Sequence, residues 1–168
     1  NRVKIKVCGL KKTDEVKCAA DYGANWYGMI FEKSSPRFIN FKQAEVLLNS
    51  TPDCIEPIAV TVNPSYSKIY ELISLGFNYV QLHGNESINF CKSLKSKFNL
   101  KIIKAINVKS MKDLEYASSY KNTVDWLLFD YKDDLLAGGT GKSFNWNLLS
   151  NKTLSFNWIL SGGLDYNN

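Results

Sequence analysis

"PIAVTVNPSYSKIYELISLGFNYVQLH", residues 57–83, contains two short apolar runs on either side of a stretch with helical periodicity. The runs PIAVTV (57–62) and NYVQLH (78–83) have the length and the β-branched content of strands. The intervening SYSKIYELISLG (65–76) repeats its apolar residues at helical spacing and ends in Gly76, a residue type that commonly terminates a helix. A strand, a helix and a strand in this order predict one parallel βαβ unit.

The same alternation recurs along the chain. Helical stretches separate the runs, and in the first of these stretches we predict Thr13 as the N-cap and Gly23 as the stop. The starts of the seven strand-like runs are separated by 23, 31, 21, 23, 24 and 32 residues. The five further runs are VKIKVC (3–8), WYGMIF (26–31), KIIKAI (101–106), DWLLFD (125–130) and NWILSG (157–162).

This spacing predicts an α/β fold, a parallel (βα)8 barrel (TIM barrel), because about 200 residues close the smallest barrels of eight units. The alternative is an open doubly wound sheet, which would be expected to carry G-x-G-x-x-G after its first strand, where this chain has CGLKKT (8–13). Only seven runs are visible, and an open barrel would expose two unpaired strand edges. We therefore expect residues 1–168 to form a single barrel domain that is incomplete at its C-terminus. The last one to two βα units, about 35 residues, would be absent from this sequence.

The composition narrows the class of protein. Of 168 residues, 45% are hydrophobic and 22% charged, which fits one ordinary globular domain. Lys and Arg outnumber Asp and Glu by 21 to 16, but the lysines are scattered, so we expect no nucleic-acid partner. The chain shows neither a signal peptide nor an apolar run long enough to span a membrane, so we expect no membrane association and a cytoplasmic protein. One histidine and four cysteines without C-x-x-C spacing predict no metal site: Cys8, Cys18, Cys54 and Cys91.

A nucleotide-binding loop is a possible reading of LLAGGTGKSFNW (135–146), because Gly141-Lys142-Ser143 resembles the end of a P-loop. The first glycine of that pattern is replaced by Leu136, and two carboxylates precede the loop. We therefore do not expect ATP or GTP to bind there, and we predict no cofactor.

Polar residues end several of the predicted strands, where parallel barrels carry their functional groups. Because side chains alternate along a strand, Lys6 and Cys8 should share the inner face, as should Gln81 and His83, with Asp130 inside at the end of its strand. Simpler interpretations remain open for each residue. Cys8 could be a core residue, Asp130 a helix cap and His83 the anchor of a turn.

Six motifs in this chain together resemble the phosphoribosylanthranilate isomerase family, and they occur in the expected order over residues 6–164. They are KVCGL (6–10), SPRFI (35–39), VQLHG (80–84), LLFD (127–130), GGTGKSFNW (138–146) and LSGGL (160–164). The resemblance implies an Amadori rearrangement of a small phosphoribosyl substrate in tryptophan biosynthesis, without a cofactor, by a monomer or homodimer. It also makes residues 138–146 an active-site loop. The sequence departs from the family at Thr61, where an aromatic residue is usual and the pocket wall should differ.

The resemblance also implies roles for single residues. Cys8 would be the general base, favoured as a thiolate by Lys6 on the same face, and Asp130 the general acid, kept protonated by a dry site. The substrate-binding residues would be Arg37 at the anthranilate, Gln81 and His83 in the pocket lining, and Gly162 and Gly163 at the phosphate. The alternatives are a non-catalytic phosphate-ligand-binding barrel and a related sugar-phosphate barrel enzyme of tryptophan or histidine biosynthesis.

Overall fold

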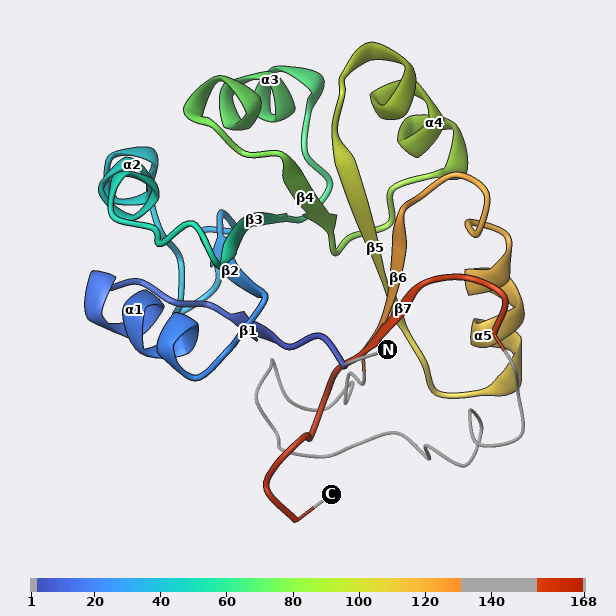
Figure 1. Cartoon of the computed structure of the whole chain (residues 1–168). Helices are drawn as coiled ribbons and strands as arrows, with labels where there is room; N and C mark the ends of the chain where they lie inside the picture. Colours follow the sequence, from blue (N-terminus) through green and yellow to red (C-terminus); the bar gives the residue numbers. More distant parts are fainter. Residues whose placement is uncertain (1–2, 131–153, 168) are drawn as a thin grey trace.

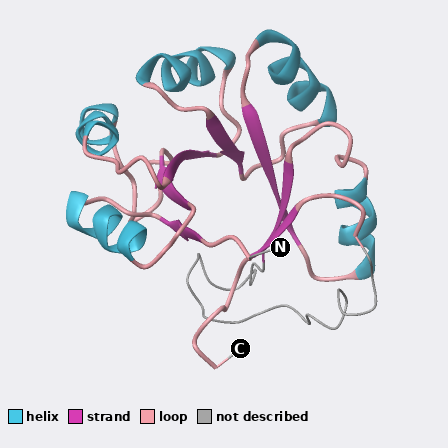
Figure 2. Ribbon diagram, in the orientation of Figure 1, coloured by secondary structure: helices cyan, strands magenta, loops and turns pink. Residues whose placement is uncertain are grey.

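The computed structural model describes residues 3–130 and 154–167. Its strands lie around a common centre and its helices lie outside them (Figures 1 and 2). The strands are β1 (Lys6–Cys8), β2 (Trp26–Ile30), β3 (Glu56–Thr61), β4 (Tyr79–Leu82), β5 (Lys101–Asn107), β6 (Trp126–Asp130) and β7 (Trp158–Leu160). The helices of the described part are α1 (Thr13–Asp21), α2 (Phe41–Asn49), α3 (Tyr66–Leu75), α4 (Ile88–Lys97) and α5 (Met111–Ser118).

The seven strands form one sheet in which each strand pairs in parallel with the next strand of the chain. All seven predicted strands are therefore present, and the alternation of strand and helix is confirmed through β6. The N-cap of α1 is Lys12 rather than the predicted Thr13, because the Glu15 carboxylate accepts the backbone N–H groups of Lys11 and Lys12 and starts the helix one residue earlier. Gly23 and Gly76 follow α1 and α3 with φ of 83° and 112°, as expected of helix stops.

Two apolar clusters follow from side-chain alternation along the strands. In β4 and β6, Val80, Leu82, Leu127 and Phe129 belong to the outer cluster, which also contains the buried faces of the helices. The inner cluster fills the centre of the sheet with Trp26, Ile30, Ile58, Val60, Ile103, Ala105 and Leu128. Each strand therefore uses one face for packing against helices and the other for the interior.

Aromatic rings occupy the interior at the amino-terminal ends of the strands. The rings of Trp26 and Trp126 meet edge to face at 5.2 Å, and Tyr79 lies 6.4 Å from Trp26. The Lys4 ammonium lies over the Trp26 ring at 4.9 Å, a cation–π geometry.

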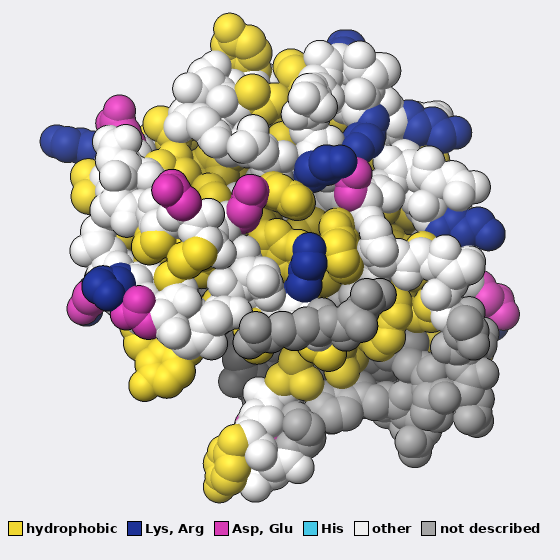
Figure 3. Space-filling model, in the orientation of Figure 1, with side chains coloured by type: hydrophobic (Ala, Val, Ile, Leu, Met, Phe, Trp, Pro, Cys, Tyr) yellow, Lys and Arg dark blue, Asp and Glu magenta, His cyan; other side chains and the backbone are white. Residues whose placement is uncertain are grey.

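Hydrophobic side chains gather near the centre of the face shown in Figure 3. The Lys and Arg side chains on this face are spread out and do not form a single basic patch.

A buried ion pair ties together the loops at the carboxyl ends of β3 and β4. Lys104 Nζ lies 3.0 Å from Glu86 Oε2, and both side chains are 2% exposed. The Glu86 carboxylate also accepts the backbone N–H of Asn63 at 2.8 Å and that of Gly84 at 3.0 Å. The hydroxyl of Tyr120, beyond α5, donates to the Glu86 carbonyl at 2.9 Å. Because Glu86 accepts a backbone N–H from the loop after β3 and another from the loop after β4, it holds the two loops together.

We expect Lys104→Met to lower the free energy of unfolding by about 3–5 kcal/mol, because it leaves the Glu86 charge buried without its cation. Urea denaturation measures the change. The matched control is Lys17→Met, which breaks the exposed Lys17–Asp21 pair and should leave the stability close to wild type. A Lys104→Met loss no larger than that of the control would contradict the role of the buried pair.

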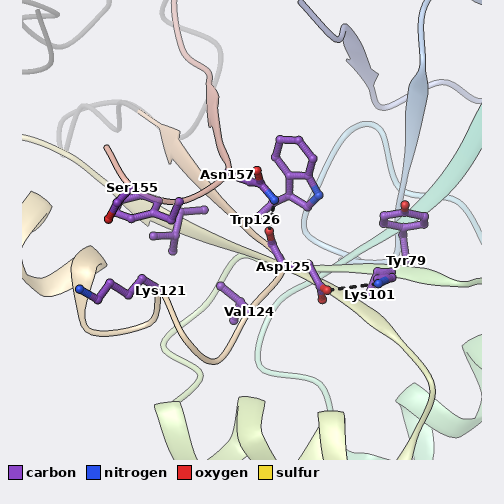
Figure 4. Close-up of a pocket in the computed structure, with 10 residues that line it drawn as sticks. Tyr79, Lys101, Lys121, Val124, Asp125, Trp126, Ser155 and Asn157 are labelled. Carbon is purple, nitrogen blue, oxygen red and sulfur yellow. Dashed lines mark hydrogen bonds and ion pairs between the residues drawn. The ribbon is translucent and has the colours of Figure 1, made fainter. Parts of the chain in front are cut away.

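A second charged group joins α4, β5 and β6 at the opposite ends of the strands. Asp125 Oδ2 accepts from Lys95 Nζ at 2.7 Å and from the backbone N–H of Ile102 at 2.8 Å. Lys101 Nζ lies 3.5 Å from Asp125 Oδ1 (Figure 4). Burial alone would raise the pKa of Asp125. The hydrogen bonds from Lys95 and Ile102, with the charges of Lys95 and Lys101, outweigh it and lower that pKa below its ordinary value.

A carboxyl whose pKa is lowered by folding stabilises the protein above its unfolded pKa, about 3.9, and loses that contribution as the pH falls through the folded value. Wild-type stability, measured by urea denaturation from about pH 5 to pH 2, should therefore include a loss due to Asp125 below about pH 4. Asp125→Asn should be less stable at neutral pH and should lose less on acidification. Parallel stability profiles for the two proteins would show that Asp125 makes no such contribution.

Candidate active site

The side chains of Lys6 and Cys8 lie beside Gly28 of the neighbouring strand, on the inner face predicted for them. A Cβ atom added at Gly28 would lie 2.8 Å from Cys8 Sγ and 3.3 Å from Lys6 Nζ. Cys8 packs against the inner cluster and is only partly buried. Position 28 therefore has to be a glycine for the thiol and the ammonium to occupy this space together.

The thiol of Cys8 is only partly buried, whereas that of Cys91 is fully buried on the inner face of α4. Burial raises the pKa of Cys91 to about 11, so this thiol is unreactive at neutral pH. Cys18 and Cys54 are exposed, and all four cysteines are free.

The structure brings Gln81, His83 and Asp130 into one chain of contacts. His83 Nε2 lies 3.3 Å from Asp130 Oδ2, and their side chains are 30% and 23% exposed. Gln81 Nε2 lies 2.9 Å from His83 Nδ1, on the side of the ring away from Asp130. Gln81 is 2% exposed, so it lies beneath His83 rather than on the surface of the pocket. Gln81, His83 and Asp130 face the interior as predicted. The sequence did not predict that His83 contacts both of the others.

Arg37 reaches the end of β1 from the loop after β2. Its Nη1 donates to the Cys8 carbonyl at 2.9 Å. The side chain crosses Gly9, where an added Cβ would lie 2.7 Å from Arg37 Cδ, and Gly9 has a φ of 86°. Gly9 is thus required both by its backbone conformation and by the close approach of the guanidinium.

Gly162 and Gly163 follow β7 with φ of 88° and 71°, a conformation that favours glycine. The backbone N–H of Ser161 donates to Phe129 O at 2.8 Å, which holds this segment beside the end of β6 and Asp130. The other predicted loop, residues 135–146, lies outside the described residues.

A cavity of about 350 Å³ opens at the carboxyl ends of β3, β4 and β5. His83 is part of its wall, as are Val62 and Asn63 from the loop after β3. Thr61, which we expected to shape the wall, is instead buried and donates its hydroxyl to the Gln81 carbonyl at 3.2 Å. The wall position is the next residue, Val62. Ile58 and Val60 face the interior, and Val62 continues this alternation by one more step. This pattern is visible in the sequence and predicts Val62, not Thr61, as the wall residue.

A larger cavity of about 450 Å³ lies at the opposite ends of the strands, where Tyr79, Lys101 and Trp126 begin β4, β5 and β6 (Figure 4). In parallel barrels the reacting groups lie at the carboxyl ends of the strands, and residues at the amino-terminal ends serve stability. We therefore take the mouth that contains Cys8, His83 and Asp130 as the candidate active site. Among residues 3–130 and 154–167, no cluster of His, Cys, Asp and Glu is arranged to hold a metal ion, and no helix is long and apolar enough to cross a membrane.

Comparison with known proteins identifies the family of this chain. A family model described as N-(5'-phosphoribosyl)anthranilate (PRA) isomerase matches residues 5–168. The N-(5'-phosphoribosyl)anthranilate isomerase of Zymomonas mobilis subsp. mobilis is 36% identical over 99% of this chain and 80% of its own length. The enzyme of the same name from Trichodesmium erythraeum is 37% identical over 96% of this chain and 72% of its own length.

Solved structures agree with the sequence comparison. The crystal structure of phosphoribosyl anthranilate isomerase from Thermotoga maritima superposes with a TM-score of 0.89 at 31% identity, covering 99% of this chain and 80% of its own. A phosphoribosyl anthranilate isomerase in complex with reduced 1-(o-carboxyphenylamino)-1-deoxyribulose 5-phosphate superposes with a TM-score of 0.85 at 28% identity, covering 99% of this chain and 79% of its own. With the parallel seven-stranded fold and the polar groups at its mouth, these matches show that the chain belongs to the N-(5'-phosphoribosyl)anthranilate isomerase family.

Proposed function

We propose that this chain converts N-(5'-phosphoribosyl)anthranilate to 1-(o-carboxyphenylamino)-1-deoxyribulose 5-phosphate in tryptophan biosynthesis, by acid–base chemistry that needs no cofactor. One observation carries the proposal for the site. Cys8 and Asp130 face the interior at the same mouth from β1 and β6, with Arg37 held at the Cys8 carbonyl. A thiol and a carboxyl are a suitable base and acid if they stay in opposite protonation states.

The reaction begins with two proton transfers and ends with a tautomerisation. Asp130 gives its proton to the ring oxygen of the ribose as the C1–O bond breaks, and the nitrogen lone pair forms the C=N bond of a Schiff base. The Cys8 thiolate then removes the proton on C2, and the electrons of that C–H bond form the enolamine, which tautomerises to the ketone. Lys6 shares the space beside Gly28 with Cys8, so its ammonium lies close to the proposed base.

Binding of the substrate involves its two anionic ends. Arg37 is exposed at the mouth and carries a planar guanidinium suited to the carboxylate and the ring of anthranilate. Gly162 and Gly163, in their left-handed conformation, offer backbone N–H groups to the phosphate. His83 lines the pocket beside Asp130, with Gln81 directly beneath it.

The continuous parallel pairing from β1 to β7 supports a single (βα)8-barrel domain of which residues 1–168 are part. The four free cysteines support a cytoplasmic location. A crystal structure exists of monomers generated from the dimeric Thermotoga maritima enzyme, so we propose that this chain is a monomer or a homodimer.

The test of this proposal is direct conversion of N-(5'-phosphoribosyl)anthranilate by the purified protein, followed by chromatography of substrate and product. Cys8→Ala and Asp130→Asn should each lower kcat by about 10²–10⁴-fold, with KM little changed, because each removes one positioned proton transfer. Cys18→Ala removes an exposed thiol and is the matched control. A non-catalytic barrel would bind the product but would not form it. A Cys8→Ala variant with near-normal kcat would show that Cys8 is a structural residue of the core and not the general base.

Arg37→Ala should act mainly on KM, raising it by about 10- to 100-fold, because a charge-assisted contact to the anthranilate carboxylate is lost. Arg37→Lys should recover only part of the loss, since an ammonium lacks the planar donor pair. Steady-state kinetics separate the two parameters. A large fall in kcat with unchanged KM would instead show that Arg37 acts through the Cys8 carbonyl on the position of the thiol.

A further inference from the structure

We infer that Gln81 is a positioning residue that holds the ring of His83 with its proton on Nε2, directed at Asp130. The inference rests on the proposed function only in taking Asp130 as the group that gives up a proton. The contact between Gln81 and His83 is independent of that function.

The geometry assigns the tautomer. Gln81 Nε2 lies 2.9 Å from His83 Nδ1, and a side-chain amide nitrogen can only donate. His83 Nδ1 must therefore accept, so the ring proton sits on Nε2. That nitrogen lies 3.3 Å from Asp130 Oδ2.

The opposite orientation of the Gln81 amide is less favourable. Gln81 Oε1 is buried and has no hydrogen-bond partner among the residues that the structure describes. Turning the amide over would place its NH₂ group there, with two donors in place of one acceptor. Buried unpaired N–H groups are rarer in proteins than under-satisfied carbonyls, so the amide favours the orientation that donates to His83.

The tautomer matters because Asp130 changes charge during the reaction. Once Asp130 has passed its proton to the ring oxygen of the substrate, its carboxylate accepts the Nε2–H of His83, and His83 itself neither gains nor loses a proton. With the proton on Nδ1, the lone pair of Nε2 would face that carboxylate and repel it. His83 and Asp130 are partly exposed at the mouth, whereas Gln81 is buried, so Gln81 acts through His83 rather than on the substrate.

The chain contains one histidine, so its imidazole can be observed directly. In protein labelled with ¹⁵N-histidine, the ¹⁵N chemical shifts of the ring report which nitrogen carries the proton, and a His83→Asn spectrum identifies its signals. Wild type should show Nε2 protonated and Nδ1 unprotonated. Gln81→Glu, which preserves the shape but only accepts, should show Nδ1 protonated.

In Gln81→Glu, kcat should fall by about 10- to 100-fold with KM changed less than about threefold, because Nε2 of His83 no longer carries a proton to donate to the Asp130 carboxylate. Gln81→Met removes the donor without adding charge. It should populate both ring protonation patterns and lower kcat in the same direction. Thr61→Val is the matched control, because the buried Thr61 hydroxyl donates to the backbone carbonyl of Gln81 and the substitution leaves the backbone bond from His83 N–H to the Thr61 carbonyl in place. It should match wild type in both measurements.

Wild-type protein with Nδ1 protonated would overturn the inference. So would a Gln81→Glu variant that keeps the wild-type ring spectrum or the wild-type kcat. If Gln81→Glu does not fold, wild-type values for Gln81→Met in both measurements overturn it equally. A wild-type protein that fails to convert the substrate refutes the proposed function, while the ring spectrum still decides the tautomer.

Discussion

Each strand of this sheet hydrogen-bonds in parallel to the strand that follows it in the chain, so the carboxyl ends of all seven strands lie at one mouth. Side-chain alternation then divides every strand between the helices and the interior. Cys8, His83 and Asp130 come from β1 and from the ends of β4 and β6, and parallel pairing brings these distant positions to the same opening. The chemistry of the site is a consequence of this single arrangement of strands.

A buried charge holds the mouth in shape on one side. Glu86 accepts backbone N–H groups from the loops after β3 and β4, and Lys104 neutralises it from β5. The carbonyls of Leu82 and Gly84 accept from the same ammonium, at 3.3 and 2.8 Å, so the donors of Lys104 are also used. The loop that begins with His83 is therefore fixed by hydrogen bonds that solvent cannot easily replace.

Two glycines make the other side of the mouth possible. Gly28 leaves room for the side chains of Lys6 and Cys8, and Gly9 lets Arg37 cross the end of β1. In both places any side chain would collide with a group proposed to act on the substrate. These glycines serve close approach, and only Gly9 also has a backbone conformation that favours glycine.

The sequence by itself determined the seven strands, the helix stops at Gly23 and Gly76, and the inward direction of Cys8, Gln81 and Asp130. These features follow from local periodicity and backbone preference, which a chain expresses within a few residues. The tertiary structure alone decided the contacts of His83 with Gln81 and Asp130, the hydrogen bond from Arg37 to the Cys8 carbonyl, and the Glu86–Lys104 pair. It also showed that Val62, and not Thr61, lies in the wall of the cavity at the mouth. Arg37 and Cys8 are 29 residues apart and Lys104 and Glu86 are 18 apart, so which groups meet depends on strand register and loop path. Hydrogen bonds between such residues form only when the sheet has assembled, because no local pattern specifies a distance across it.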